Sequence, residues 1–211
     1  MGYYPVFLEM KERRCVVIGG GAVAQRKVAG LLAAGADVTV ISPVITEELR
    51  SLIGRRAIAH LARIYKKGDL ADYAIAFVAT DDPEINAAVS SDSRSLNVWV
   101  NVADDPAHCD FILPAIVRRG ELTIAVSSSG ASPAVTAVIR EELEEYFTDD
   151  YARLVQIASE VRRELSEKSL CLSGEAWNKA LKGPLRRLIR EGRATEAKKF
   201  LLEALEADLC R

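Results

Sequence analysis

Three adjacent glycines follow a short apolar run near the N-terminus. The run begins at Cys15, the glycines are Gly19, Gly20 and Gly21, and Ala24 completes a G-x-G-x-x-A spacing. In this pattern the first glycine allows a tight exit from a strand. Gly21 lets the backbone approach a diphosphate, and the small Ala24 lets a helix pack closely on the sheet. Free N–H groups at the helix start would then hold the phosphates, so the chemistry indicated is dinucleotide binding.

The segments around this turn match the context in which such a motif binds a dinucleotide. The apolar run reads as a strand, Val23–Ala34 as a helix that Gly35 ends, and Asp37–Ile41 as the next strand. The unit takes about 30 residues, which is the expected length. The same glycines would also suit a tight strand–helix turn without a ligand, but the surrounding pattern favours the binding site.

The residue expected to contact the ribose departs from the usual pattern. An acidic side chain is expected about 20 residues after the first glycine. Ser42 stands there, 23 positions after Gly19, whereas Asp37 lies at the other end of the strand. Ribose recognition would therefore use the Ser42 hydroxyl or backbone groups near Pro43 and Val44. The spacing does not separate NAD from NADP, but no arginine follows to bind a 2′-phosphate, which favours NAD.

Two polar loops follow later strands. Thr80-Asp81-Asp82 comes after one apolar run, and residues 101–110 gather three aspartates and His108. Ligands in such folds lie beyond the carboxyl ends of the strands. A carboxylate there could accept or orient a proton while hydride moves to the nicotinamide. Asp104-Asp105-Pro106 could equally be an ordinary turn, because Asp and Pro both favour turns.

Short apolar runs alternate with helix-like segments through the first two thirds of the chain. Nearly continuous apolar strands separated by helices predict a parallel sheet covered on both faces, an α/β fold of Rossmann type. The predicted strands are Pro5–Glu9, Cys15–Ile18, Asp37–Ile41, Ala57–Ile64, Ala74–Ala79, Val98–Asn101 and Leu122–Ser127. Helices are predicted after the N-caps Thr46 and Ser132 and around Pro83. The helix after Ser132 runs to about Phe147. Its predicted buried positions are Ala134, Ala137, Val138, Leu143 and Phe147.

The last third of the chain has a different composition. Residues 137–211 hold 29 charged residues, as many as residues 1–136, but only three glycines and one proline. Such a segment predicts amphipathic helices. Its basic pairs are interleaved with Leu and Glu, which is typical of solvated helix faces rather than of a nucleic-acid patch.

Overall composition argues against several classes of protein. Lys and Arg number 28 and Asp and Glu 30, and a net charge of −2 is unlike that of a nucleic-acid-binding protein. No apolar run approaches the roughly 20 residues of a membrane span, and the N-terminus lacks the features of a signal peptide. Four scattered cysteines suit a reducing compartment, and two histidines are few for a zinc site. We therefore expect a cytoplasmic protein without a bound metal.

Six short segments occur in an order typical of one family. They are Tyr4-Pro-Val-Phe7, Gly19-Gly-Gly-Ala-Val-Ala-Gln-Arg-Lys27, Ala79-Thr-Asp-Asp82, Asn101-Val-Ala-Asp-Asp-Pro106, Phe111-Ile-Leu-Pro114 and Ser127-Ser-Ser-Gly-Ala-Ser-Pro133. As a set they resemble precorrin-2 dehydrogenase, which is also the N-terminal module of siroheme synthase. The resemblance covers residues 3–147, and the rest of the chain matches only in being helical.

The resemblance implies NAD-dependent oxidation of precorrin-2 to sirohydrochlorin by an interwoven homodimer. It implies a Rossmann domain over residues 1–114, a small α+β dimerisation region over 115–147 and a helical C-terminal domain over 148–211. The family's essential aspartate corresponds to Asp104. Some members of the family also insert Fe(II) into sirohydrochlorin, and Co(II) is a further candidate metal substrate. No methyltransferase extension is expected after Arg211. The implied cofactor contacts are Gly19, Gly20, Gly21, Ala22, Val23, Pro43, Val44 and Thr80.

A substrate that carries many carboxylates needs a cleft rich in basic or N–H groups. Candidates are Arg118-Arg119, the Ser127–Ser129 turn and the helix start at Ser132-Pro133. For the arginine pair, a solvated turn before Gly120 is the favoured interpretation, whereas Ser132 could equally be an ordinary N-cap. The predicted substrate contacts are His108, Ser128 and Ser132.

A second class of function stays open. A non-catalytic Rossmann module could sense NAD and report its state to a helical interaction domain. Such a sensor has no need of Asp104, so this residue separates the two hypotheses.

Overall fold

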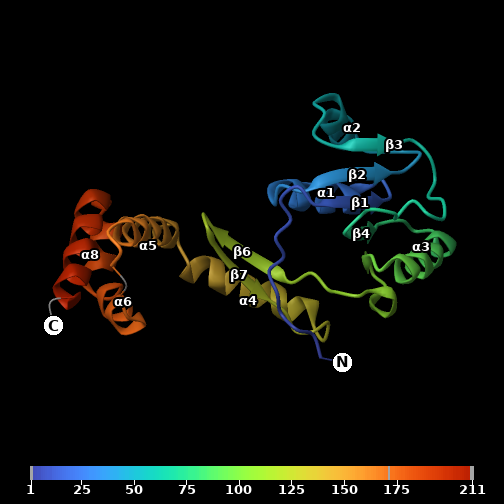
Figure 1. Ribbon diagram of the computed structural model, residues 1–211. Helices are drawn as coiled ribbons and strands as arrows, with labels where there is room; N and C mark the ends of the chain where they lie inside the picture. Colours follow the sequence, from blue (N-terminus) through green and yellow to red (C-terminus); the bar gives the residue numbers. More distant parts are fainter. Residues whose placement is uncertain (1, 171, 210–211) are drawn as a thin grey trace. The chain divides into compact units, whose positions relative to one another are not determined.

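The computed structural model describes residues 2–170 and 172–209 and divides between Leu113 and Pro114 into two compact units (Figure 1). This division lies next to the predicted end of the Rossmann domain. The predicted dimerisation region and helical domain lie together in the second unit, so a boundary between them near residue 147 stays a prediction. Cys171, Cys210 and Arg211, which entered the sequence argument, lie outside the described residues.

Five parallel strands form the sheet of the first unit. They are β1 (Arg14–Ile18), β2 (Asp37–Ile41), β3 (Ala59–Leu61), β4 (Ile75–Val78) and β5 (Trp99–Val102), and they are connected through α1 (Ala22–Ala33), α2 (Glu47–Gly54) and α3 (Pro83–Leu96). The strand order is β3-β2-β1-β4-β5, so the chain builds outward from one side of β1 and then crosses to the other side. This reversal is the topological switch point at which Rossmann folds bind their ligands, beyond the carboxyl ends of the strands.

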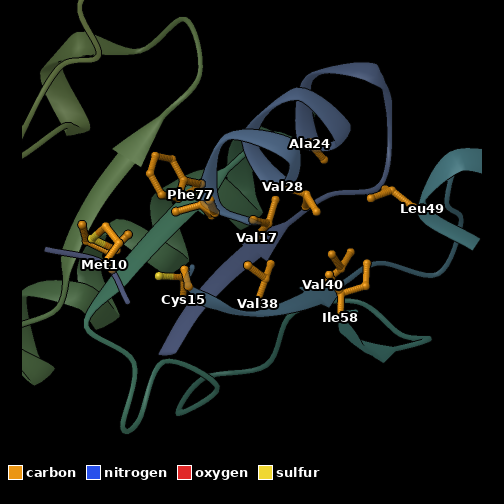
Figure 2. Close-up of a cluster of buried hydrophobic side chains, with 13 residues drawn as sticks. Met10, Cys15, Val17, Ala24, Val28, Val38, Val40, Leu49, Ile58 and Phe77 are labelled. Carbon is orange, nitrogen blue, oxygen red and sulfur yellow. The ribbon is translucent and has the colours of Figure 1, made fainter. Parts of the chain in front are cut away.

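Alternate residues of the central strand β1 enter two separate apolar layers. Val17 packs with Val38 of β2 in the layer that includes residues of α1 and α2 (Figure 2). Val16 lies in the opposite layer, together with Val89 of α3. Because strand side chains alternate between faces, a strand covered on both sides must be apolar throughout. The continuous apolar runs of the sequence therefore predicted this sheet correctly.

The cap predicted at Thr46 is present, and the helix start predicted around Pro83 is capped by Asp82. At α2, the Thr46 hydroxyl oxygen accepts the Leu49 N–H at 3.3 Å. At α3, the Asp82 carboxylate accepts the N–H groups of Glu84 and Ile85 at 2.9 and 3.2 Å. These oxygens satisfy N–H groups that the first turn of a helix leaves unpaired.

One predicted strand is wrong. Pro5–Glu9 has no regular secondary structure, and all of its side chains are exposed. No strand of the described chain pairs with it. An apolar run becomes a strand only when a neighbour supplies the ladder, and Pro5 has no N–H to contribute to one.

The second unit begins with a two-stranded antiparallel sheet of β6 (Ala115–Arg119) and β7 (Leu122–Val126). β7 agrees with the predicted strand at Leu122–Ser127, whereas β6 has no predicted counterpart. The solvated turn expected at Arg118-Arg119 is wrong, because both arginines belong to β6. The turn lies at Gly120, which has a φ of +57°.

Arg119 has a structural role that the sequence did not reveal. Its Nε donates to the Phe147 carbonyl at 2.6 Å and its Nη2 to the Glu144 carbonyl at 2.8 Å. These carbonyls lie at the end of α4 (Pro133–Tyr146), where backbone oxygens lack partners within the helix. The guanidinium therefore ties β6 to the last turn of α4.

Helix α4 begins at the predicted N-cap Ser132 but contains no buried residue. Val135, Val138 and Ile139 are 51%, 54% and 36% exposed. The predicted burial of Ala134, Ala137 and Val138 is therefore wrong within this chain, while Leu143 and Phe147 are half-buried. The helix packs on β6 and β7, and two strands are too few to cover its apolar positions.

The rest of the second unit is helical, as predicted. Its helices are α5 (Asp150–Glu167), α6 (Gly174–Ala180), α7 (Pro184–Arg190) and α8 (Ala194–Leu209). Val161 of α5, Leu185 of α7 and Leu201 of α8 meet in a common fully buried core. Within the described chain, no helix is both long enough and apolar enough to span a membrane.

A buried carboxylate ties the connection between β3 and β4 to the sheet's second face. Asp92 of α3 is 5% exposed, and its Oδ2 accepts the Tyr65 hydroxyl at 2.5 Å and the Gly68 N–H at 2.7 Å. Burial by itself would raise the pKa of Asp92, but these hydrogen bonds favour the charged form and hold its pKa below the usual value. Burial and the same carboxylate raise the pKa of Tyr65.

We predict that Asp92→Asn lowers the free energy of unfolding by about 1–3 kcal/mol at neutral pH, because the amide is uncharged and cannot accept as strongly. A depressed pKa in the folded state stabilises the protein above the unfolded-state pKa, so this difference should shrink as the pH falls below about 4. Urea unfolding over a range of pH measures it. The control is Asp72→Asn. Asp72 lies on the connection between β3 and β4 that Asp92 holds, but its side chain is highly exposed, so this variant should change the free energy of unfolding by less than about 0.5 kcal/mol. Equal losses for both variants would contradict the prediction.

Candidate functional site

The glycine turn after β1 makes two close backbone contacts that exclude any side chain. A Cβ on Gly19 would lie 2.1 Å from the Ala79 carbonyl oxygen, and one on Gly20 would lie 2.0 Å from the Val44 carbonyl oxygen. Gly19 also has a φ of +115°, which favours glycine. The turn therefore packs directly against the loops that follow β4 and β2.

Gly21 differs from its two neighbours because the space beside it is open. A Cβ built there would meet no atom within 4 Å. Gly21 is the N-cap of α1, and no side chain accepts from the first turn of this helix, which also holds no acidic residue. At α2 and α3, by contrast, Thr46 and Asp82 occupy these positions. The start of α1 thus presents accessible N–H groups and fits a diphosphate.

The loop after β2 uses the Ser42 hydroxyl for its own structure. Ser42 is 7% exposed, and its hydroxyl donates to the Val44 carbonyl at 2.6 Å. The ring nitrogen Nε2 of His60 lies 2.9 Å from the Ser42 carbonyl oxygen. Val44 itself is 77% exposed. Of the two groups predicted to contact a ribose, the geometry favours the backbone and side chain near Pro43 and Val44.

Thr80 lies where the loop after β4 meets the glycine turn. Its backbone nitrogen would be 3.4 Å from a Cβ on Gly19, so the two segments are in contact. Its hydroxyl oxygen accepts the Asp82 N–H at 2.9 Å. The structure therefore brings the predicted cofactor contacts at Gly19–Val23, Ser42–Val44 and Thr80 to one edge of the sheet.

The acidic loop after β5 begins with a strained residue. Asp104 has a φ of +59°, in the left-handed region that few residues other than glycine, Asn and Asp adopt. Its side chain is exposed and has no hydrogen bond or ion pair within the described residues. Because β5 is parallel to β4 and β1, Asp104 emerges at the same edge of the sheet as the glycine turn.

The other two aspartates of this loop have partners. Asp110 accepts the Val100 N–H through Oδ2 at 2.8 Å and fastens the end of the loop to β5. Asp105 Oδ2 lies 2.6 Å from His108 Nδ1. The sequence grouped three carboxylates together, whereas the structure leaves only Asp104 unengaged among them.

A buried anchor beneath the loop was missed by the sequence analysis. Lys27 of α1 donates from Nζ to Asn101 Oδ1 at 3.3 Å, and Asn101 Nδ2 donates to the Phe111 carbonyl at 3.0 Å. Burial, and then Arg26, lowers the pKa of Lys27, while Cys109 and Asp104 act in the opposite direction. The spacing of residues along the predicted helix could have placed Lys27 on its inner face. Lys27 stands three residues after the buried Ala24 and so shares the inner face of α1.

Cys109 completes this anchor. Its sulfur accepts the Val102 N–H at 3.1 Å, and its thiol lies within 3.2 Å of the carbonyls of Val102 and Asp105. Burial raises the pKa of the Cys109 thiol above its ordinary value, so the neutral form is favoured. The thiol therefore serves the loop as a hydrogen-bonding structural group.

Ser128 and Ser132 lie in the second unit and bond to each other. The Ser128 hydroxyl oxygen accepts the Ser132 N–H at 3.0 Å, and Ser132 Oγ accepts the Val135 N–H at 3.3 Å. Ser132 is thus an N-cap, as one of the two interpretations expected. Contact of either serine with a substrate stays a prediction.

Comparison with known families agrees with the geometry of the first unit. The family model described as "Putative NAD(P)-binding" matches residues 6–115, which is more than half of the chain. The chain belongs to this NAD(P)-binding family. A second model, described as "Sirohaem biosynthesis protein central", matches residues 119–146 of the second unit. The expected dinucleotide cofactor and the family resemblance seen in the sequence are therefore confirmed.

Individual proteins that are similar to this chain agree with the two family models. The chain is 39% identical over 209 residues to a siroheme synthase of Nitrosomonas europaea and 38% identical over 212 residues to one of Nitrosospira multiformis. These matches cover 98% of this chain but only 44% and 45% of the relatives, so the chain spans less than half of their length. A solved structure titled "SirC, precorrin-2 dehydrogenase" matches with a TM-score of 0.76 and 26% identity, over 97% of this chain and 100% of that one. This match confirms the predicted fold class.

We predict that substitutions at two adjacent glycines of this NAD(P)-binding turn affect different properties, stability at Gly20 and cofactor binding at Gly21. Gly20→Ala places a methyl group against the Val44 carbonyl and should cost about 1–3 kcal/mol of stability. Gly21→Asp projects into open space, so the melting temperature should hold, but its charge would repel a diphosphate and abolish NAD binding. Scanning calorimetry measures the melting temperature, and titration calorimetry measures the affinity for NAD. Unchanged NAD affinity in Gly21→Asp would place the cofactor elsewhere.

Proposed function

We propose that this chain catalyses the NAD-dependent oxidation of precorrin-2 to sirohydrochlorin, a step of siroheme biosynthesis. The observation that carries the proposal is the unengaged Asp104 at the same sheet edge as an open glycine turn. The similarity to SirC over nearly the whole of both chains supports it. The similarity to the siroheme synthases supports it as well.

The chain's residues have distinct tasks in this proposal. NAD, when bound, supplies the acceptor for the hydride. The turn of Gly19, Gly20 and Gly21, with Ala22 and Val23, holds its diphosphate, and Asp104 faces the nicotinamide end. Glu47 and Glu48 open α2 just beyond the ribose loop, and two carboxylates there would repel a 2′-phosphate. Their charge supports NAD over NADP.

A second copy of the chain is the proposed partner of α4. Its apolar residues Val135, Val138 and Ile139 are exposed, and Ile116 of the neighbouring β6 is 39% exposed. Exposed apolar side chains of this kind mark an interface, and a homodimer would bury them. The family model for the siroheme central region covers this same segment.

Three further expectations remain proposals or predictions. The cytoplasm is the proposed compartment, supported by the free thiols of Cys15 and Cys109. His108, Ser128 and Ser132 are the proposed substrate contacts. Insertion of Fe(II) or Co(II) stays a prediction of the family resemblance, without a structural observation of its own.

The decisive experiment follows the absorbance of precorrin-2 incubated with NAD and the purified chain. We predict that Asp104→Ala keeps the fold and NAD affinity but lowers kcat by about 100-fold or more, because the substrate loses the free carboxylate that orients it beside the nicotinamide. Undiminished turnover in this variant would remove the role of Asp104. NAD binding without any turnover by the unmodified chain would instead support the sensor hypothesis.

We also predict that Val138→Asp converts a dimer into a monomer, because a charge buried at an apolar interface lacks a partner. Light scattering after size-exclusion chromatography measures the molar mass. Glu144→Gln is the control, since Glu144 pairs with Arg140 on another side of α4. A monomeric unmodified chain, or a dimeric Val138→Asp variant, would contradict this interface.

A further inference from the structure

Asp105 and His108 form a histidine–carboxylate pair in the loop directly after Asp104. Pro106–His108 forms a single turn of 3-10 helix, and His108 Nδ1 lies 2.6 Å from Asp105 Oδ2. Within the described chain the ring makes no other hydrogen bond, so Nε2 is without a protein partner. The His108 side chain is 42% exposed, so its ring is accessible from solvent.

The pair rests on a rigid support. The Asp105 carbonyl accepts from the His108 N–H at 3.2 Å and lies 3.2 Å from the Cys109 thiol. Cys109 is bonded in turn to both backbone groups of Val102, the last residue of β5. The Asp105 backbone, which carries the carboxylate that orients the imidazole, is therefore tied to the end of strand β5 through Cys109.

A carboxylate on Nδ1 determines what the other nitrogen can do. Asp105 selects the tautomer with the proton on Nδ1, so Nε2 carries the free lone pair. The same carboxylate stabilises the imidazolium that forms when Nε2 takes up a proton. A histidine oriented by a carboxylate in this way is suited to accept and release a proton through its other ring nitrogen.

We propose that His108, oriented by Asp105, is the proton acceptor of the oxidation; this inference rests on the proposed function. Oxidation of the macrocycle removes two hydrogens. One leaves as hydride with the electron pair of its C–H bond and reduces NAD. The other leaves as a proton, its bonding pair enters the extended conjugation, and an N–H bond forms at His108 Nε2. The exposed ring then releases this proton to water, while Asp104 positions the macrocycle.

The competing interpretation is a surface ion pair that only closes the 3-10 turn. Such a pair contributes little to stability and nothing to turnover. The two interpretations differ in their response to added imidazole, which can replace a missing proton acceptor but cannot replace a packing contact.

The test compares kcat for precorrin-2 oxidation in His108→Ala with and without imidazole. We expect kcat to fall about 100-fold, NAD affinity to hold, and imidazole to restore turnover at least about tenfold. His108→Gln, which retains much of the side chain's volume, should lose as much kcat and keep the melting temperature. His60→Ala controls only for the specificity of the rescue: His60 bonds to the Ser42 carbonyl of the proposed cofactor loop, so its turnover can change, but imidazole should not restore it.

The outcomes separate this inference from the proposed function. An unmodified chain that does not oxidise precorrin-2 overturns the proposed function and this inference with it. If the unmodified chain is active, a His108→Ala variant with undiminished kcat overturns the inference alone. A fall in kcat that imidazole does not reverse also overturns it, because the ring would then be structural.

Discussion

The site depends on one steric constraint, the contact of two loops with the backbone of two glycines. Gly19 touches the loop after β4 and Gly20 the loop after β2 at distances that exclude a Cβ. With any side chain at either position the loops would move apart, and the start of α1 would no longer lie between them. A Cβ on the third glycine would meet no atom within 4 Å, and this open space fits a ligand. The same short segment therefore combines two positions required by packing with one that stays available for binding.

The acidic loop after β5 divides its polar groups between structure and chemistry. Asn101, Cys109 and Asp110 bond to the backbone of β5 and of the loop itself, and Lys27 supports them from α1. Asp104 is left without a partner, in a left-handed conformation that this anchoring maintains. Strained residues held by their surroundings are frequent at functional sites. Because the other polar groups of the loop already have hydrogen-bond partners, the Asp104 carboxylate is left free.

The second unit has one part that buries its apolar side chains and another part that leaves them exposed. The helices α5 to α8 enclose a core of their own, whereas α4 and the β6–β7 sheet leave apolar side chains exposed. A two-stranded sheet by itself is at most marginally stable in water, and its packing with α4 leaves Val135, Val138 and Ile116 exposed. Association with a second copy is a simple way for this segment to remove that surface from water.

The sequence by itself determined the features that act over a few residues. The apolar run of β2, the caps Thr46 and Ser132, the helix start around Pro83 and the glycine turn were all predicted correctly, because each depends on local spacing and backbone conformation. The tertiary structure decided the rest. Pro5–Glu9 is no strand because no neighbour pairs with it, and Arg119 caps α4 from a different element. Lys27 meets Asn101 across 74 positions of sequence, and Asp104 remains free because other groups take the available partners. Such contacts depend on which segments the packed sheet brings together, and no local pattern contains that information.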